Sequence, residues 1–140
     1  MRNTALIHDA DHPGVPNSQL VKEKTDTAIL YNNKSVAEKN SVDLAWNLLM
    51  EGQYQDLRNC IYTNQTELER FRQLVVNSVM ATDIVDKELG ALRKGRWNKA
   101  FSSEDGDDEE SEKEQTDRKA TIVIEHLIQA ADVSHMMQRK

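Results

Sequence analysis

The chain has little of what marks secreted or membrane-spanning proteins. Cys60 is the single cysteine among 140 residues, so no disulfide can form within the chain, which is typical of a reducing compartment. No apolar run approaches the ~20 residues needed to cross a bilayer, and residues 1–9 contain no signal-peptide core. We therefore expect an intracellular, cytoplasmic location and no membrane segment in this chain. A longer parent protein could still be tethered to a membrane.

Positive charge is also scarce. The chain has 18 lysines and arginines against 24 aspartates and glutamates, for a net charge of −6. Nine of the acids lie between Glu104 and Asp117 with one lysine, and the rest of the chain carries 17 basic and 15 acidic residues. A body so close to neutral has no basic stripe, so we expect no nucleic-acid partner.

The acidic stretch belongs to a low-complexity segment, residues 102–119. The segment has too few apolar side chains to offset the entropy of ordering, so it predicts a disordered, exposed insert. An EF-hand calcium loop is not expected at residues 105–112, because the acids there do not alternate around a central glycine.

Outside this insert, apolar residues recur at steps of three and four, and no internal repeat is visible. Ser35 with Glu38, and Thr66 with Glu69, have the spacing of N-terminal capping boxes. The length suits one domain of modest size. These patterns predict an all-α helical bundle with helices over residues 35–50, 66–89 and 121–137, and a helix-to-loop transition over residues 93–101.

The residues that most strongly suggest chemistry are His8, Asp9, Asp11 and His12, which precede a Pro-Gly breaker. Neutral imidazole suits zinc or iron, and a carboxylate can bridge two ions. The alternative is a helix end at which aspartate and histidine side chains complement exposed backbone groups. Four such side chains within five residues favour a metal site over that alternative.

The run H-D-A-D-H-P-G-V-P-N from His8 to Asn17 resembles the metal-binding motif of the class I 3',5'-cyclic nucleotide phosphodiesterases. Three later segments match that family in order: S-V-A-E ending at Glu38, A-T-D ending at Asp83, and Q-A-A-D-V-S around Asp132. The resemblance covers nearly the whole chain apart from the acidic insert.

The resemblance implies a helical catalytic domain of the HD type in which His8, Asp9 and Asp132 bind two divalent metal ions. The expected ions are Zn²⁺ together with Mg²⁺ or Mn²⁺, with Asp9 between them. The implied reaction is hydrolysis of a 3',5'-cyclic nucleotide, cAMP or cGMP or both, to a 5'-monophosphate in signal transduction.

Three further residues take roles from the same resemblance. His12 and Glu38 are expected to orient ligands or a bridging water, and Thr82 to act through a metal-bound water. The residues alone leave simpler readings open. Glu38 can cap its helix, Thr82 can bond to a carbonyl one turn earlier, and Asp132 can pair with a neighbouring Lys or Arg.

The sequence departs from the family at several positions. Asn40 and Ser41 stand where histidine is common, Lys87 where a histidine is usual, and Gln129 replaces a histidine. The family's upstream H-N-x-x-H motif, which supplies a metal ligand and the general acid, and its downstream nucleotide-clamping segment have no counterpart here. We therefore expect residues 1–140 to form a partial catalytic domain, incomplete at both ends. On its own it should bind metal weakly, hydrolyse poorly and self-associate through exposed helix faces.

Two other functions stay open. One is another metal phosphohydrolase of the HD superfamily, and the other is a catalytically dead helical interaction module with an acidic loop. Metal content discriminates between an enzyme and an interaction module, because the module need hold no metal.

Overall fold

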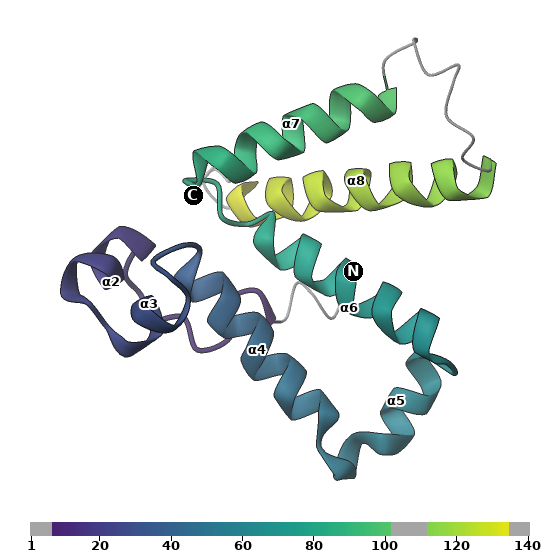
Figure 1. Cartoon of the computed structure of the whole chain (residues 1–140), viewed down its shortest axis with the longest axis horizontal. Coiled ribbons are helices and arrows are strands. Elements are labelled where there is room, and N and C mark those ends of the chain that lie inside the picture. The colour runs from purple at the N-terminus through teal and green to yellow at the C-terminus, as the bar shows by residue number, and fades with distance from the viewer. Residues whose placement is uncertain (1–6, 102–111, 135–140) are drawn as a thin grey trace.

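The computed structural model describes residues 7–101 and 112–134, and all the elements in these ranges are helices (Figure 1). In chain order they are α2 (Asn17–Glu23), α3 (Asp26–Leu30), α4 (Val36–Met50), the short 3-10 helix η1 (Gly52–Tyr54), α5 (Gln55–Ile61), α6 (Gln65–Met80), α7 (Lys87–Phe101) and α8 (Glu112–Val133). The all-α prediction is therefore confirmed over the described ranges. None of the helices there has the length and apolarity to span a membrane.

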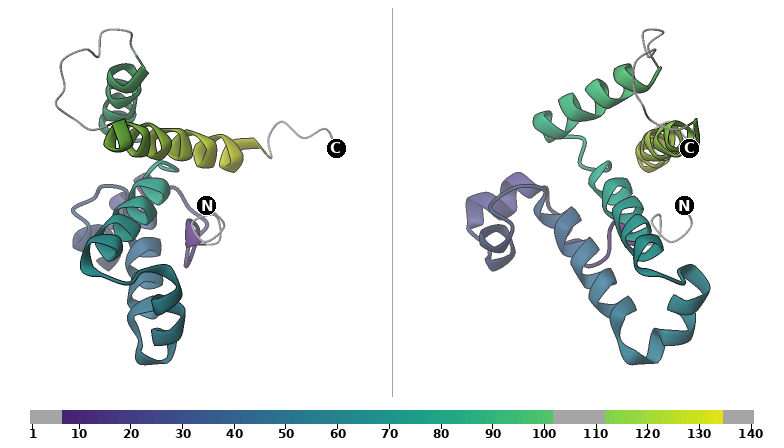
Figure 2. Two further views of the ribbon diagram at one scale, coloured as in Figure 1. Left: turned by 90° about the vertical axis from the view of Figure 1, so that its right-hand side faces the viewer. Right: turned by 45° about the vertical axis from the view of Figure 1, so that its right-hand side comes forward.

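The C-terminal helices form a hairpin that rests on the middle of the chain (Figures 1 and 2). Helices α7 and α8 lie side by side, and α8 also contacts α6. Helix α4 contacts α6, while α2 and α3 pack on the N-terminal end of α4. Each of α4, α6 and α8 has an apolar side chain that is at most 1% exposed: Val36, Val79 and Ile122. Burying a side chain of this size contributes about 1.5–3 kcal/mol.

Helix α4 matches its predicted range to within one residue, and Arg58 on α5 closes its C-terminal end. The buried guanidinium donates from Nη1 to the carbonyls of Leu49 and Glu51, at 2.7 Å each. It also donates from Nη2 to the side chain of Gln55. The last carbonyls of a helix have no partner within that helix. Arg58 therefore satisfies two of them and fixes the turn into α5.

The prediction of one helix over residues 66–89 is wrong. Helix α6 ends at Met80 and α7 begins at Lys87, so the A-T-D segment lies in the break between two helices. Residues 93–101, for which a transition into a loop was predicted, lie inside α7.

The break follows from two aspartates whose side chains accept hydrogen bonds from nearby backbone amides. Asp83 Oδ1 accepts from the N–H groups of Val85 and Asp86, at 3.2 and 3.1 Å. Asp86 Oδ1 accepts from those of Glu88 and Leu89, at 2.8 and 3.0 Å. Such local bonds offer the backbone an alternative to the helical ladder. The apolar spacing continues across the break, which is why periodicity alone does not reveal it.

The capping box of α6 is also displaced from the predicted pair at Thr66 and Glu69. Asn64 is the N-cap, and its side-chain oxygen accepts from the Glu67 N–H at 2.9 Å. Glu67 in turn accepts from the N–H of Thr63 at 2.7 Å. The cap therefore lies two residues earlier than predicted, with asparagine in place of threonine, and Glu67 binds the N–H of the residue before the N-cap rather than that of the N-cap itself.

Helix α8 begins at Glu112, nine residues before its predicted start. Residues 112–119 are therefore helical, and the prediction of irregular structure there is wrong, while residues 102–111 and 135–137 lie outside the described ranges. Glutamate, lysine and glutamine are good helix formers when solvated, and Arg70 on α6 pairs with Asp117 at 2.7 Å.

One carboxylate is buried between α7 and α8. Glu125 is 2% exposed, and Arg96 Nη1 lies 3.0 Å from each of its two oxygens. Oε2 accepts a hydrogen bond from Arg96, whereas the buried Oε1 accepts none from the described part of the chain. Burial raises the pKa of the Glu125 carboxyl above 4.5, and the positive charge of Arg96 offsets only part of that rise. The ionised form of Glu125 is thus less favourable in the folded state than in the unfolded state.

We predict that Glu125 makes stability depend on pH. The folded state holds the Glu125 proton more tightly than the unfolded state does. The free energy of unfolding therefore falls as pH rises from 4.5 to the raised folded pKa, and this contribution is constant above that pKa. Urea unfolding over a pH series checks this. The fall should be reduced in Glu125→Gln and retained in Glu69→Gln, an exposed site on α6. Equal curves for wild type and Glu125→Gln would contradict the assignment.

Candidate metal centre

Three side chains from the two ends of the described chain meet at one point. His8 and Asp9 lie in the turn before α2, and Asp132 lies near the C-terminal end of α8. His8 Nε2 is 3.2 Å from Asp9 Oδ2 and 3.3 Å from Asp132 Oδ1. One ligand atom from each residue lies within 4.8 Å of the other two. An imidazole nitrogen with two carboxylate oxygens is a donor set that fits a divalent ion such as Zn²⁺ or Mn²⁺.

Short-range hydrogen bonds build the turn that carries the first two of these residues. The Ala10 N–H donates to the Ile7 carbonyl at 3.0 Å, and the His12 N–H donates to the Asp9 carbonyl at 3.1 Å. Asp11 adopts a left-handed φ of 59°, which aspartate tolerates better than most residues. The backbone thus reverses within four residues and leaves the Asp9 side chain 66% exposed.

The ring of His12 is held in one tautomer. The Gly14 N–H donates to His12 Nδ1 at 3.0 Å, and Gly14 has a φ of 74° that favours glycine. Because a backbone N–H can only donate, Nδ1 is an acceptor, and neutral His12 carries its proton on Nε2. The Nε2–H group of neutral His12 can therefore donate a hydrogen bond.

Helix α4 holds the same turn from the other side. The buried Ser41 donates from Oγ to the Ala10 carbonyl at 2.7 Å. Asn40 donates from Nδ2 to Asp11 Oδ2 at 3.0 Å. These are two of the positions at which the sequence departs from histidine. Here the smaller polar side chains bind the turn directly, at positions one and two residues after Asp9.

Helix α4 is not capped by the predicted pair of Ser35 and Glu38. Ser35 occupies the N-cap with a left-handed φ of 46°, and its side chain makes no capping hydrogen bond. The cap comes from Asn17 instead, whose Oδ1 accepts from the Ala37 N–H at 2.9 Å. Glu38 is thus released from a capping role, and its Oε2 accepts from Asn17 Nδ2 at 2.8 Å.

The electrostatic surroundings of Glu38 link it to two other site residues. Burial raises the pKa of the Glu38 carboxyl above its ordinary value. The hydrogen bond from Asn17 and the neighbouring His12 lower the pKa by less, and the negative charge of Asp83 raises it further. Asp83 is itself 5% exposed. Glu38 therefore lies within electrostatic reach of both the His12 turn and the A-T-D segment.

Thr82 bonds to the helix that precedes it. Its Oγ1 donates to the Val79 carbonyl at 2.7 Å, which is the simpler of the two readings of this residue. Arg93 on α7 donates to the carbonyls of Met80 and Asp83, at 3.4 and 3.3 Å, so α7 holds the backbone on both sides of Thr82. A role for Thr82 toward a metal ion stays a prediction.

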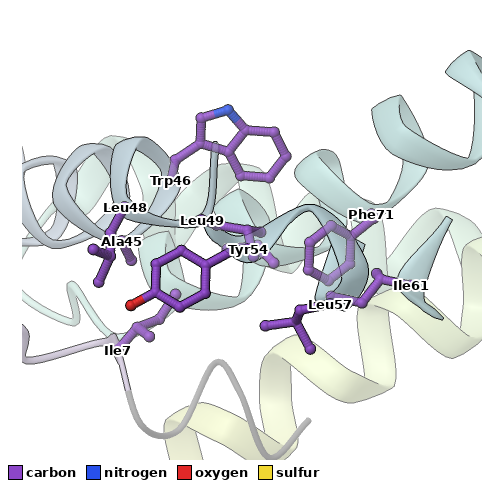
Figure 3. Close-up of a pocket in the computed structure, with 10 residues that line it drawn as sticks. Ile7, Ala45, Trp46, Leu48, Leu49, Tyr54, Leu57, Ile61 and Phe71 are labelled. Carbon is purple, nitrogen blue, oxygen red and sulfur yellow. The ribbon is translucent and has the colours of Figure 1, made fainter. Parts of the chain in front are cut away.

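An apolar pocket of about 280 Å³ opens between α4, α5 and α6 (Figure 3). Ile7, the residue before His8, is part of its wall. The rings of Trp46 and Phe71 lie 6.0 Å apart, and the Arg72 guanidinium lies 5.5 Å from the Trp46 ring. The other lining residues are Ala45, Leu48, Leu49, Tyr54, Leu57, Ile61 and Val75. The wall is almost entirely apolar or aromatic and is not suited to binding a phosphate.

The sequence model of the 3',5'-cyclic nucleotide phosphodiesterase family matches residues 2–139. The chain therefore belongs to this family, as the motif resemblance implied.

Individual relatives match a part of the chain. It is 41% identical over 81 residues to the cGMP-inhibited 3',5'-cyclic phosphodiesterase 3A of Homo sapiens. The matched region covers 57% of this chain and 7% of that protein. It is 36% identical over 81 residues to the dual specificity calcium/calmodulin-dependent 3',5'-cyclic nucleotide phosphodiesterase 1C of Mus musculus, over 58% of this chain and 11% of that protein. The chain thus spans about a tenth or less of these relatives' length.

Solved structures match over nearly the whole chain. The phosphodiesterase domain of the rhodopsin phosphodiesterase of Salpingoeca rosetta aligns with a TM-score of 0.72 at 22% identity, over 97% of this chain and 38% of that one. A second structure of the phosphodiesterase domain from that organism gives a TM-score of 0.68 at 23% identity. At this level of identity the likeness establishes the fold, which is that of a phosphodiesterase catalytic domain.

The sequence predicted the clustered residues but not the side chains that hold them in place. Asn17 lies inside the matched motif without an assigned role, and Asn40 and Ser41 stand out only as departures from the family. One signal was available, since Ser41 follows Glu38 by three positions and the two share a face of a helix. The hydrogen bonds from α4 to the turn cross about thirty residues of sequence, and no local pattern reports them.

We predict that Ser41→Ala weakens metal binding. The substitution removes the hydrogen bond to the Ala10 carbonyl and loosens the turn that carries Asp9, so Mn²⁺ affinity should fall by about tenfold. Isothermal titration with Mn²⁺ measures the change. Ser78→Ala is the matched control, because the Ser78 hydroxyl is equally buried and has no hydrogen-bond partner among the described residues. Equal Mn²⁺ affinities in the two variants would contradict the prediction.

Proposed function

We propose that this chain carries part of the active site of an enzyme that hydrolyses 3',5'-cyclic nucleotides, cAMP or cGMP, to 5'-nucleoside monophosphates. The observation that carries the proposal is the meeting of His8, Asp9 and Asp132 within 4.8 Å in a chain of this family. The relatives named above are cyclic nucleotide phosphodiesterases. The chain covers a small part of each, so the activity of the whole protein belongs to the proposal.

His8, Asp9 and Asp132 are the residues that would hold two divalent ions, which we assign as Zn²⁺ together with Mg²⁺ or Mn²⁺. The donor set supports this, since imidazole suits zinc and carboxylates suit all three ions. Asp9 is the most exposed of the three side chains, so its carboxylate would be the most accessible to an incoming ion. When bound, such ions lower the pKa of water and stabilise charge on phosphoryl oxygens.

Residues around the cluster supply hydrogen bonds of both kinds. His12 carries its proton on Nε2 and can donate to a water, while the Glu38 carboxylate can accept from one. The raised pKa of Glu38 brings this carboxyl closer to neutral pH, which suits a group that exchanges protons with a water. Thr82 would contribute through a metal-bound water, for which its oxygen keeps lone pairs.

We predict that metal binding and hydrolysis both depend on Asp9. Asp9→Ala should lower Mn²⁺ affinity at least tenfold and cAMP or cGMP turnover at least a hundredfold. Asp56→Ala, at an exposed position on α5, should change neither. Titration with Mn²⁺ and a hydrolysis assay are run on this chain and on a full-length protein containing it, and the full-length protein should turn over faster. Metal-independent turnover that survives Asp9→Ala would overturn the mechanism, and absence of metal binding and turnover in both proteins would favour an interaction module.

We also propose that the chain is intracellular and self-associates through its exposed apolar surface. Leu48 and Leu57 line the pocket of Figure 3 and remain 48% and 51% exposed, and exposed apolar patches favour association. The lone, exposed Cys60 suits a reducing compartment. Sedimentation should find species larger than a monomer, and Leu57→Glu should return them to monomer. A monomeric wild-type chain at high concentration would contradict self-association.

A further inference from the structure

Asn17 connects two segments that meet beside the candidate metal centre. It is the first residue of α2, and both ends of its side-chain amide are used. Oδ1 accepts from the Ala37 N–H at 2.9 Å, and Nδ2 donates to Glu38 Oε2 at 2.8 Å. One side chain thus binds a backbone group and a carboxylate on the first turn of α4. A side-chain amide can accept through its oxygen and donate through its nitrogen at the same time.

The first turn of α4 depends on this contact because its own N-cap does not supply one. Ser35 is buried at the N-cap, yet its side chain makes no capping hydrogen bond. The amides of a first helical turn have no partner within the helix. Asn17 therefore satisfies the Ala37 N–H from a position that is twenty residues away in sequence.

The same turn of α4 is tied to the residues that carry the candidate ligands. Ser41 lies one turn beyond Glu38 and binds the Ala10 carbonyl, next to Asp9. A fixed Glu38 carboxylate therefore has a fixed position relative to the turn that holds His8 and Asp9. Because Glu38 Oε2 already accepts from Asn17, we assign Oε1 as the oxygen that would accept a hydrogen bond from a water that Glu38 orients.

We propose that Asn17 is a positioning residue for Glu38, through an amide that fixes the start of α4 with its oxygen and the direction of the Glu38 carboxylate with its nitrogen. The proposal rests on the proposed function, in which Glu38 orients water at the metal centre. The Asn17 side chain thus has two roles: it caps α4, and it orients the Glu38 carboxylate. The two roles can be tested separately.

Asn17→Asp keeps the first role and removes the second. Its carboxylate still accepts from the Ala37 N–H, and a negative charge at a helix N-terminus is favourable. The donor to Glu38 is replaced by a second carboxylate at the same place, and like charges raise the pKa of a carboxyl. The variant should keep its helical circular dichroism, while the carbon-13 signal of the Glu38 carboxyl titrates at higher pH than in wild type.

In the full-length protein, Asn17→Asp should lower kcat by 10–100-fold, with little change in KM, and move the acid limb of the pH–rate profile upward. Asn47→Asp is the matched control, since Asn47 is an exposed asparagine on α4, the helix that carries Glu38. It should leave both the Glu38 titration and kcat unchanged. An Asn17→Asp variant with wild-type Glu38 titration and wild-type kcat would reduce Asn17 to a cap and overturn the proposal.

A double variant keeps the proposal testable if Asn17→Asp destabilises the fold. In Asn17→Asp with Glu38→Gln the hydrogen bond is reversed, because the new amide can donate to the new carboxylate. Thermal stability should return to the wild-type value while kcat stays low. A double variant as unstable as the single one would show that residues 17 and 38 are not coupled. Failure of the proposed function gives a different result. Turnover then survives Asp9→Ala, while the shift of the Glu38 titration in Asn17→Asp is still observed.

Discussion

The docking of α8 onto α6 decides whether the candidate metal centre exists. Asp132 reaches His8 only because α8 packs against α6 and α7, with Ile122 and Ile128 buried on its inner face. The two carboxylates that meet at His8 repel each other, and a divalent ion bound there would offset that repulsion. Metal affinity and the position of α8 are therefore coupled, and an ion that binds the native cluster stabilises the fold.

The features that could be predicted from the sequence are those that depend on residues close to one another along the chain. The motif around His8 and Asp9 is contiguous, and the family resemblance pairs it with Asp132 from the sequence alone. The helical class follows from apolar spacing, and α4 lies where that spacing places it. Periodicity reports which face of a helix is apolar, and it does so well where one helix lies alone between clear breakers.

The features that the sequence did not predict depend on side chains that bind backbone groups. Asp83 and Asp86 end one helix and begin the next within an unbroken apolar pattern. Ser35 has the spacing of a cap, yet the cap is Asn17, which folding brings from a distant part of the chain. The charged residues at the start of α8 were predicted to form a solvated loop, although the same composition also suits a solvated helix. In each case two local structures suit the same residues, and tertiary contacts select one.

The placement of the hairpin ends has a consequence for how this family can diversify. Phe101 and Glu112 lie at the end of the α7–α8 hairpin opposite the one that carries Asp132 (Figure 1). A helix rises about 1.5 Å per residue, so the start of α8 and Asp132 are roughly 30 Å apart. The entropic cost of closing a loop grows slowly with the number of residues in it. A change in the length or charge of the connection between these two helix ends, or a whole module inserted there, would therefore lie far from the candidate metal centre.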